Sequence, residues 1–185
     1  MPDNVVGGIE KIEYAAASLT GVVTTWKPMP NIAVGSVLHT KNVGTKSTIN
    51  KEDGARTFIN IFTPSEGDTL TIGLLSQDPT LLSELFSTKY TAATTLTEFY
   101  AEDKIANLAI KITCNPMKDG RKCIIIFYNT DVQTGYTNNI TFDQVQQLAL
   151  TAALGTYLTT GDTKAKVYSK QWVLANGTTI DSTAA

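Results

Sequence analysis

The residues from Asp68 to Leu74 constrain the fold more than any other segment, because apolar and small polar residues alternate along them without interruption. Leu70, Ile72 and Leu74 occupy every second position, and the positions between them are Thr or Gly. Successive side chains of an extended strand point to opposite faces. This spacing therefore predicts a strand with one face toward a core and one toward solvent.

A short helix is predicted soon after this strand, over residues 78–87. Asp78 is a residue type that caps helices, and Pro79 stands at the first helical position, where no N–H donor is needed. Apolar residues then fall on one helical stripe, which we expect to pack against a sheet. The residues of this stripe are Leu81, Leu82, Leu85 and Phe86.

The rest of the chain favours strands. Thr occurs 29 times, and this β-branched residue suits a pleated, half-exposed surface. The apolar run 123–128 predicts a central strand covered on both faces. Further strand patterns lie at residues 9–26 (two short bursts), 31–39, 58–62, 93–100, 105–113 and 163–174, with a break at the Pro-containing residues 27–30. The predicted fold is mainly β, a β-sandwich or small barrel of about ten strands with one flanking helix.

Residues 144–155 fit two patterns. Val145, Leu148, Ala149 and Ala152 have helical spacing, but apolar residues also alternate along the same stretch. Periodicity alone does not decide between a helix and a strand. We favour a long strand within residues 141–158.

Residues 40–56 form a long polar insert between two apolar strand patterns. Such inserts are uncommon in compact domains and are often functional. We predict either a solvated loop or an extended hairpin that becomes ordered against a partner. The chain as a whole, residues 1–185, is predicted to be one domain with a flexible N-terminal arm (1–8) and C-terminal tail (175–185). The insert residues expected to make assembly contacts are Lys41, Lys46, Thr48, Asn50, Lys51, Glu52, Asp53 and Arg56.

No motif predicts catalysis, a cofactor or a metal site. His39 ends an apolar strand pattern without a ligand partner at metal-binding spacing, so we predict a structural role for it. The sequence contains neither a Gly-x-Ser-x-Gly elbow nor a glycine-rich phosphate loop. The acid pairs Glu52–Asp53 and Glu102–Asp103 stand in polar segments, where solvated charge is the expected state.

Charge and hydropathy narrow the choice of partners. The net charge is −2, and the 15 Lys and Arg residues are scattered, which disfavours binding to nucleic acid. The first residues lack the basic and apolar regions of a signal peptide. No run approaches the ~18 apolar residues of a membrane helix.

Two cysteines, Cys114 and Cys123, flank residues 115–122, whose Lys-Asp-Gly run predicts a hairpin turn. They are either two reduced thiols on neighbouring strands, which we favour, or a pair joined across the hairpin. Two cysteines without further ligands make a poor zinc site.

Three segments resemble parts of one known family. Residues 66–82, Glu-Gly-Asp-Thr-Leu-Thr-Ile-Gly-Leu-Leu-Ser-Gln-Asp-Pro-Thr-Leu-Leu, resemble the strand-to-helix segment of siphophage-like major tail tube proteins. Residues 140–148, Ile-Thr-Phe-Asp-Gln-Val-Gln-Gln-Leu, are similar to a strand that follows a loop in that family. The polar insert at 40–56 is similar in position to the long loop that those proteins extend toward the next ring.

This resemblance implies a β-sandwich with a flanking helix that assembles into stacked hexameric rings. Inner strands of the subunits then form a continuous barrel, and DNA passes through its lumen without specific binding. The protein would be a structural component of the virion tail, assembled in the host cytoplasm, with other tail proteins as partners and neither cofactor nor enzymatic activity. Tubes of contractile tails and of type VI secretion systems share the fold, so a secretion tube is an alternative.

Two further hypotheses assign the chain to other classes of protein. A monomeric β-sandwich adhesin or carbohydrate-binding module would need exposed aromatic rings in a groove. The candidates for such a platform are Trp26, Trp172, Tyr136 and Tyr157. An enzyme of unrecognised type would need acids clustered in a deep pocket.

Overall fold

The computed structural model describes residues 7–50, 57–63, 67–75, 77–102, 104–137, 146–174, 176 and 178, and for residues 45–50 and 57–63 it describes the backbone alone. Most of the predicted N-terminal arm and C-terminal tail lies outside these residues. The described chain is mainly β, as predicted, with twelve strands and one short helix. In chain order they are β1 (Ile9–Ala16), β2 (Lys27–Met29), β3 (Leu38–Thr40), β4 (Thr45–Asn50), β5 (Thr57–Thr63), β6 (Thr69–Leu74), α1 (Pro79–Leu85), β7 (Thr88–Thr91), β8 (Leu96–Phe99), β9 (Ala106–Cys114), β10 (Lys122–Tyr136), β11 (Leu148–Leu154) and β12 (Ser169–Val173).

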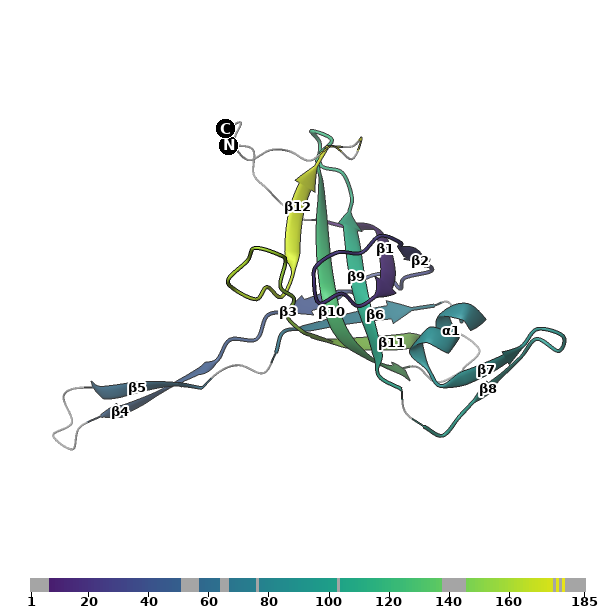
Figure 1. Ribbon diagram of the computed structural model, residues 1–185, viewed down its shortest axis with the longest axis horizontal. Coiled ribbons are helices and arrows are strands. Elements are labelled where there is room, and N and C mark those ends of the chain that lie inside the picture. Colours follow the sequence, from purple (N-terminus) through teal and green to yellow (C-terminus); the bar gives the residue numbers. More distant parts are fainter. Residues whose placement is uncertain are drawn as a thin grey trace.

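Eight strands form one antiparallel sheet in the order β2-β1-β9-β10-β11-β6-β3, with β12 also paired to β10. The sheet does not close into a barrel, so the barrel alternative is wrong for the described residues. The other four strands form two separate hairpins, β4–β5 and β7–β8. Figure 1 shows both hairpins extending from the body of the molecule, in different directions.

The long strand β10 bends the sheet over the core. Its first half, Lys122–Ile126, pairs with β12, and its second half, Thr130–Tyr136, pairs with β11. The register between β9 and β10 shifts between Phe127 and Thr130, and a bulge of this kind bends a strand and increases its twist. In Figure 1, β12 and β9 therefore run across the direction of β6 and β11. The sequence predicted only the first part of β10, residues 123–128.

The core lies between the two halves of this bent sheet and is covered at one side by α1. Leu70, Ile72 and Leu74 of β6 are at most 1% exposed, which confirms the alternation in the sequence. They lie beside Leu148 and Leu150 of the neighbouring strand β11, which are buried to the same extent. Residues 148–154 are thus a strand, as we favoured, whereas residues 138–145 lie outside the described part.

The helix α1 forms as its sequence signals predict. Asp78 Oδ1 accepts hydrogen bonds from the backbone N–H groups of Thr80 (2.9 Å) and Leu81 (3.1 Å). The helix ends at Leu85, and the amide of Phe86 donates to the carbonyl of Leu82. The predicted stripe faces the core: Leu81, Leu82 and Leu85 are buried, and Phe86 packs against the core cluster.

Strand boundaries near the N-terminal half differ from the prediction. Within residues 31–39, only the last two residues belong to a strand, as the start of β3, and Val34 is fully exposed at 104%. Asn31 and Gly35 have positive φ angles of 53° and 73°, which interrupt an extended chain. Of the pattern at 9–26, only β1 is a strand, because the chain leaves the sheet after residue 16 and exposes Val22.

Three further predictions need correction. The break expected at residues 27–30 is instead the edge strand β2, which tolerates Pro28 because an edge position needs no second partner. Residues 163–174 contain a shorter strand, β12. Residues 93–100 contain only β8. The apolar residues 58–62 form a strand as predicted, and this strand, β5, lies in the β4–β5 hairpin.

Candidate assembly surfaces

The β4–β5 hairpin, which we call the long arm, is the most prominent surface feature. Its two strands form a separate antiparallel sheet, in which Lys46 is opposite Phe62 and Thr48 is opposite Asn60. Among the described residues, neither strand pairs with any strand of the main sheet. Figure 1 shows the arm extending away from the body. The polar insert is therefore a hairpin, but its second strand lies beyond residue 56.

The root of the long arm is held by three residues of the body. The amide of Asn42 donates to Asp68 Oδ1 at 3.0 Å, and Asn42 Nδ2 donates to the carbonyl of Gly67 at 2.8 Å. Asp68 precedes β6, and its own carbonyl accepts from the amide of Leu154 at 2.9 Å. The chain thus enters and leaves the arm at one point on the main sheet.

The structure describes only some of the residues that are predicted to make assembly contacts. Lys41 is exposed beside the root of the arm. The backbones of Lys46, Thr48 and Asn50 lie in β4. The other four, Lys51, Glu52, Asp53 and Arg56, lie outside the described residues. Their role in contacts between subunits stays a prediction.

A second hairpin, β7–β8, follows α1 directly and was not predicted. The amide of Tyr100 donates to the carbonyl of Ser87 at 2.9 Å at its base. The connecting residues 92–95 contain no Gly, Asn or Pro, and Thr95 adopts a positive φ of 51°. The usual sequence signals of a tight hairpin are therefore missing. The only sequence signal for this hairpin was the β-branched and aromatic content of its two strands.

An apolar patch lies at the base of β7–β8. Its residues are Phe86, Phe99, Tyr100, Ile105 and Tyr136. The ring of Phe86 lies edge-on to Phe99 at 5.6 Å and is stacked on Tyr136 at 5.8 Å. Phe99, Tyr100, Ile105 and Tyr136 are 41–56% exposed, so a large part of their apolar surface contacts solvent.

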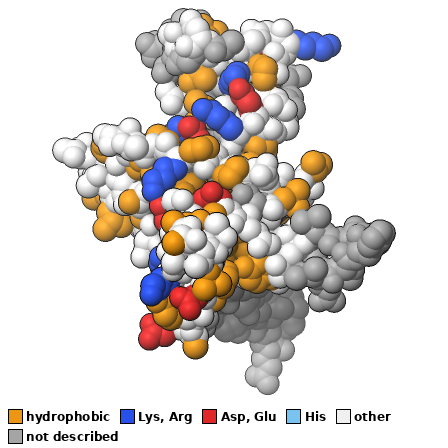
Figure 2. All heavy atoms as spheres, turned by 90° about the vertical axis from the view of Figure 1, so that its right-hand side faces the viewer, with side chains coloured by type: hydrophobic (Ala, Val, Ile, Leu, Met, Phe, Trp, Pro, Cys, Tyr) orange, Lys and Arg blue, Asp and Glu red, His pale blue; other side chains and the backbone are white. Residues whose placement is uncertain are grey.

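An open cavity of about 470 Å³ lies within this patch and is also lined by Glu102, Lys104 and Gln133. Figure 2 views the molecule from this side and shows hydrophobic side chains interspersed with charged ones. Exposed aromatic side chains that contact one another, as Phe99 and Tyr136 do through Phe86, are a feature of sites of association.

The edge strands of the main sheet differ in whether they contain proline. At β2, Pro28 removes a backbone donor, and an edge proline discourages further pairing. The outer edges of β3 and β12 contain no proline. Among the described strands, β3 pairs only with β6 and β12 only with β10, so both are edge strands of the main sheet.

In comparisons with known proteins, no family model matches this sequence, and no curated protein is similar to it. The surfaces described above, and the chemistry of the remaining cavities, are therefore the basis for a functional proposal. Within the described chain, no helix has the length and apolar character required to cross a bilayer.

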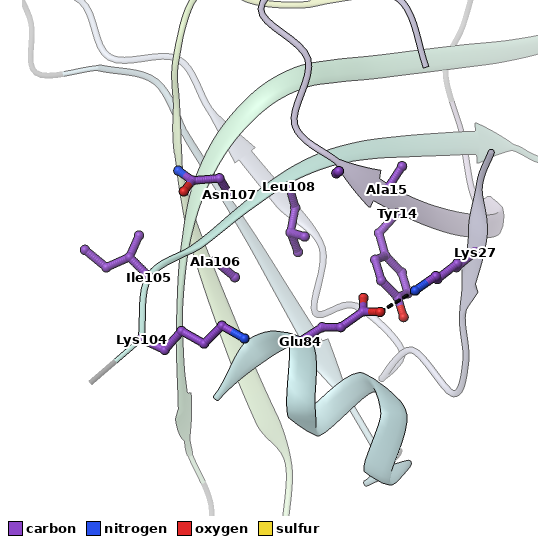
Figure 3. A pocket seen from close by; sticks show the side chains of 10 residues that line it. Tyr14, Ala15, Lys27, Glu84, Lys104, Ile105, Ala106, Asn107 and Leu108 are labelled. Atoms are coloured by element: carbon purple, nitrogen blue, oxygen red, sulfur yellow. Dashed lines mark hydrogen bonds and ion pairs between the residues drawn. The ribbon is translucent and has the colours of Figure 1, made fainter. Parts of the chain in front are cut away.

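A second cavity, of about 410 Å³, lies between α1, β1 and β9 (Figure 3). Glu84 of α1 pairs with Lys27 of β2 and accepts a hydrogen bond from the hydroxyl of Tyr14. Burial and the neighbouring Glu84 carboxylate raise the pKa of Tyr14 to about 12. Lys104 Nζ donates to the carbonyl of Ser83 at 2.8 Å. These contacts attach α1 to the sheet, and Glu84 is the one carboxylate among the described residues that line this cavity.

His39 lies in a core-like environment. Its ring makes edge contacts with Phe127 at 5.1 Å and Tyr168 at 5.2 Å. Burial lowers the pKa of His39; the Asp68 carboxylate opposes this shift and Lys41 adds to it. No group of three or more His, Cys, Asp or Glu residues is arranged to hold a metal within the described part of the chain.

The four aromatic residues considered as a ligand platform do not converge. Tyr157 is buried at 4% exposure. Trp26 lies under Lys111, whose Nζ is 4.5 Å from the ring centroid. Trp172 and Tyr136 are located at opposite ends of β10, because Trp172 is paired with Cys123. The ring of Tyr157 packs against Tyr128 at 4.6 Å, and Tyr136 belongs to the apolar patch.

Proposed function

We propose that this chain is a tail tube subunit of a phage, which assembles into stacked hexameric rings around a channel for DNA. The long arm is the observation that carries the proposal. A two-stranded hairpin is only marginally stable alone in water. The sequence of β5, Thr-Phe-Ile-Asn-Ile-Phe-Thr, is rich in apolar residues, as expected of a strand covered on both faces. A neighbouring subunit would supply this cover.

The arrangement of surfaces favours a ring over a simple dimer. A ring requires two different, complementary surfaces on each subunit, since each contact joins one face to another. The apolar patch at β7–β8 and the edge strands β3 and β12 offer two surfaces in different parts of the molecule for contacts within a ring (Figure 1). The backbone groups of an edge strand can pair with a strand of a neighbour. In this proposal the long arm is a third surface, which reaches the next ring.

The proposed channel role agrees with the charge of the chain. Attraction to DNA phosphates depends on Lys and Arg contacts and would slow the passage of DNA. A net charge of −2 provides little attraction of this kind. In this proposal the protein has a structural role and no catalytic one. Its partners are other copies of itself and other tail proteins.

Negative-stain electron microscopy of the purified protein over a range of concentrations tests the proposal. We expect rings, and tubes at the highest concentrations. Sedimentation at the same concentrations should show a species of six subunits. A protein that stays monomeric throughout would contradict the proposal.

A binding module is the second candidate, because Phe99 and Tyr100 line an open cavity that also presents Glu102 and Gln133. Aromatic faces with nearby polar groups suit a small polar ligand such as a sugar. Glycan binding by a monomer, lost in a Tyr100→Ala variant, would favour this function over the tube.

A further inference from the structure

Cys114 and Cys123 form an adjacent pair inside the main sheet. Cys114 is the last residue of β9, and Cys123 is the second residue of β10. The register of these strands places Thr113 opposite Ile124, so its continuation by one residue places the two cysteines directly opposite each other. They are 3% and 1% exposed, and their thiols share a hydrogen bond.

This placement satisfies the backbone requirement of a disulfide. Directly opposed residues of antiparallel strands have Cα atoms about 4.5 or 5.5 Å apart, depending on the type of pair. Disulfides span Cα separations of roughly 4.4–6.8 Å. Both strands are held on their outer sides as well, with Cys114 opposite Ile9 and Cys123 opposite Trp172. The two sulfur atoms are therefore kept near each other by the sheet.

We propose that Cys114 and Cys123 are a modification site, which a low-molecular-weight disulfide such as oxidised glutathione converts into a disulfide bond across β9 and β10. The structure holds both cysteines as free thiols, which is the reduced state of this site. The proposal concerns the stability of the subunit and does not depend on the proposed tube.

The reaction proceeds by two thiol–disulfide exchanges. The thiolate of one cysteine attacks a sulfur of oxidised glutathione, a mixed disulfide forms, and one glutathione thiolate leaves. The second cysteine loses its proton to solvent, attacks the protein sulfur of the mixed disulfide and releases the second glutathione. Two thiols and one oxidised glutathione become one protein disulfide and two reduced glutathiones, and two electrons pass to the oxidant.

The environment makes this reaction slow in the folded protein at neutral pH. Burial raises the pKa of both thiols, that of Cys123 to about 11, so few thiolates are present. Access requires the end of the β9–β10 hairpin to open. This end is closed by a turn in which the amide of Met117 donates to the carbonyl of Arg121 at 2.8 Å. Local opening of such a terminal segment requires less free energy than global unfolding.

The first test is independent of access to the buried thiols. The chain is oxidised with glutathione disulfide in guanidinium chloride, the monomer lighter by two hydrogen atoms is isolated, and both oxidised and reduced chains are refolded. We expect the oxidised protein to melt about 5–10 °C higher in a circular dichroism scan, because the bond closes a short loop in the unfolded chain. An unchanged or lower melting temperature, or an oxidised chain that fails to refold while the reduced chain refolds, would overturn the proposal.

The second test uses the folded protein. It is incubated with oxidised glutathione at pH 9, and intact mass and free thiols are measured without reductant. Loss of two hydrogen atoms in the monomer supports the proposal. Three outcomes would contradict the proposal. The two thiols stay free although those of the unfolded chain oxidise, or a stable mixed disulfide with glutathione forms, or a disulfide-linked dimer forms. The variants Cys114→Ser and Cys123→Ser are matched controls, in which no intramolecular bond forms and the melting temperature does not rise on oxidation.

Discussion

His39 and Glu84 are polar residues that the fold places against its core, with different consequences. The His39 ring packs between Phe127 and Tyr168, and among the described residues its Nε2 atom is buried without a hydrogen-bond partner. Glu84 is partly exposed and has two partners, Lys27 and Tyr14. The first residue should make stability depend on pH, and the second should attach α1 to the sheet.

Stability is expected to fall as the pH is lowered from 7 to 5.5, because burial lowers the pKa of His39 in the folded state. The unfolded chain, with an ordinary histidine pKa, binds more protons in this window, so protonation favours unfolding. The stabilisation by neutral His39 is present above the unfolded pKa and is lost as the pH falls toward the folded pKa. Urea unfolding at several pH values measures this effect. In a His39→Phe variant the dependence should flatten, and an unchanged slope would contradict the assignment.

A Glu84→Ala variant should lose about 1–2 kcal/mol of unfolding free energy, because the buried Tyr14 hydroxyl loses its charged acceptor. The pair with Lys27 contributes little, since that side chain is more than half exposed. Glu84→Gln is the matched control, because its amide oxygen still accepts the hydrogen bond. Ultraviolet titration should also show the Tyr14 pKa falling below about 12 in the alanine variant. Equal stability of all three proteins would rule out this role for Glu84.

At the scale of elements, the sequence predicted those parts whose signals are local. The alternation around Ile72 and the cap at Asp78 specify β6 and α1 from within a few residues, and both elements form as predicted. The β7–β8 hairpin was missed because its turn uses Thr95 at positive φ, where Gly or Asn is usual. The bend of β10 near Phe127 depends on three neighbouring strands, and no local pattern encodes it.

The same reasoning explains the outcome for the candidate site. Polar composition located the first strand of the long arm, β4, because a polar stretch between apolar strand patterns is visible in the sequence. It did not locate β5, which is apolar and lies beyond the insert. The apolar patch joins Phe86, which follows α1, to residues of β8 and β10 that are distant in the chain. The patch forms only in the tertiary fold. A single aromatic residue in a sequence gives no sign of whether it is exposed or part of the core, so the patch was not predicted.

The apolar patch should contribute to self-association. A Phe99→Ser, Tyr100→Ser variant removes two half-exposed rings without emptying the core, so the monomer should remain folded. If the patch is a contact surface, association should weaken by about ten- to a hundredfold, as for substitution of central aromatic contacts. Sedimentation equilibrium measures the change. Leu19→Ser, at a residue 67% exposed outside the patch, is the control. Equal weakening by both variants, or by neither, would exclude a specific role for the patch.

At the scale of the whole molecule, the body and the long arm are separable. The main sheet contains the buried core, whereas β4 and β5 pair only with each other in the described chain. The root contacts of Asn42 connect residues on both sides of the arm, so the body does not need the arm to bring these ends together. Folding of the body and assembly of the proposed tube should therefore respond to different changes.

Replacement of residues 45–63 by a short Gly-Ser linker should leave the melting temperature of the monomer unchanged and abolish the stacking of rings. The reason is that the arm contributes no strand to the main sheet but, in the proposed tube, reaches the next ring. A smaller deletion, of residues 44–54, removes β4 and leaves β5 without its partner. This smaller change should cause aggregation, because an apolar strand with two free edges pairs indiscriminately. Electron microscopy and thermal unfolding of both variants measure these effects. If the body unfolds without residues 45–63, the long arm is part of the core. If tubes form without these residues, another surface is responsible for stacking.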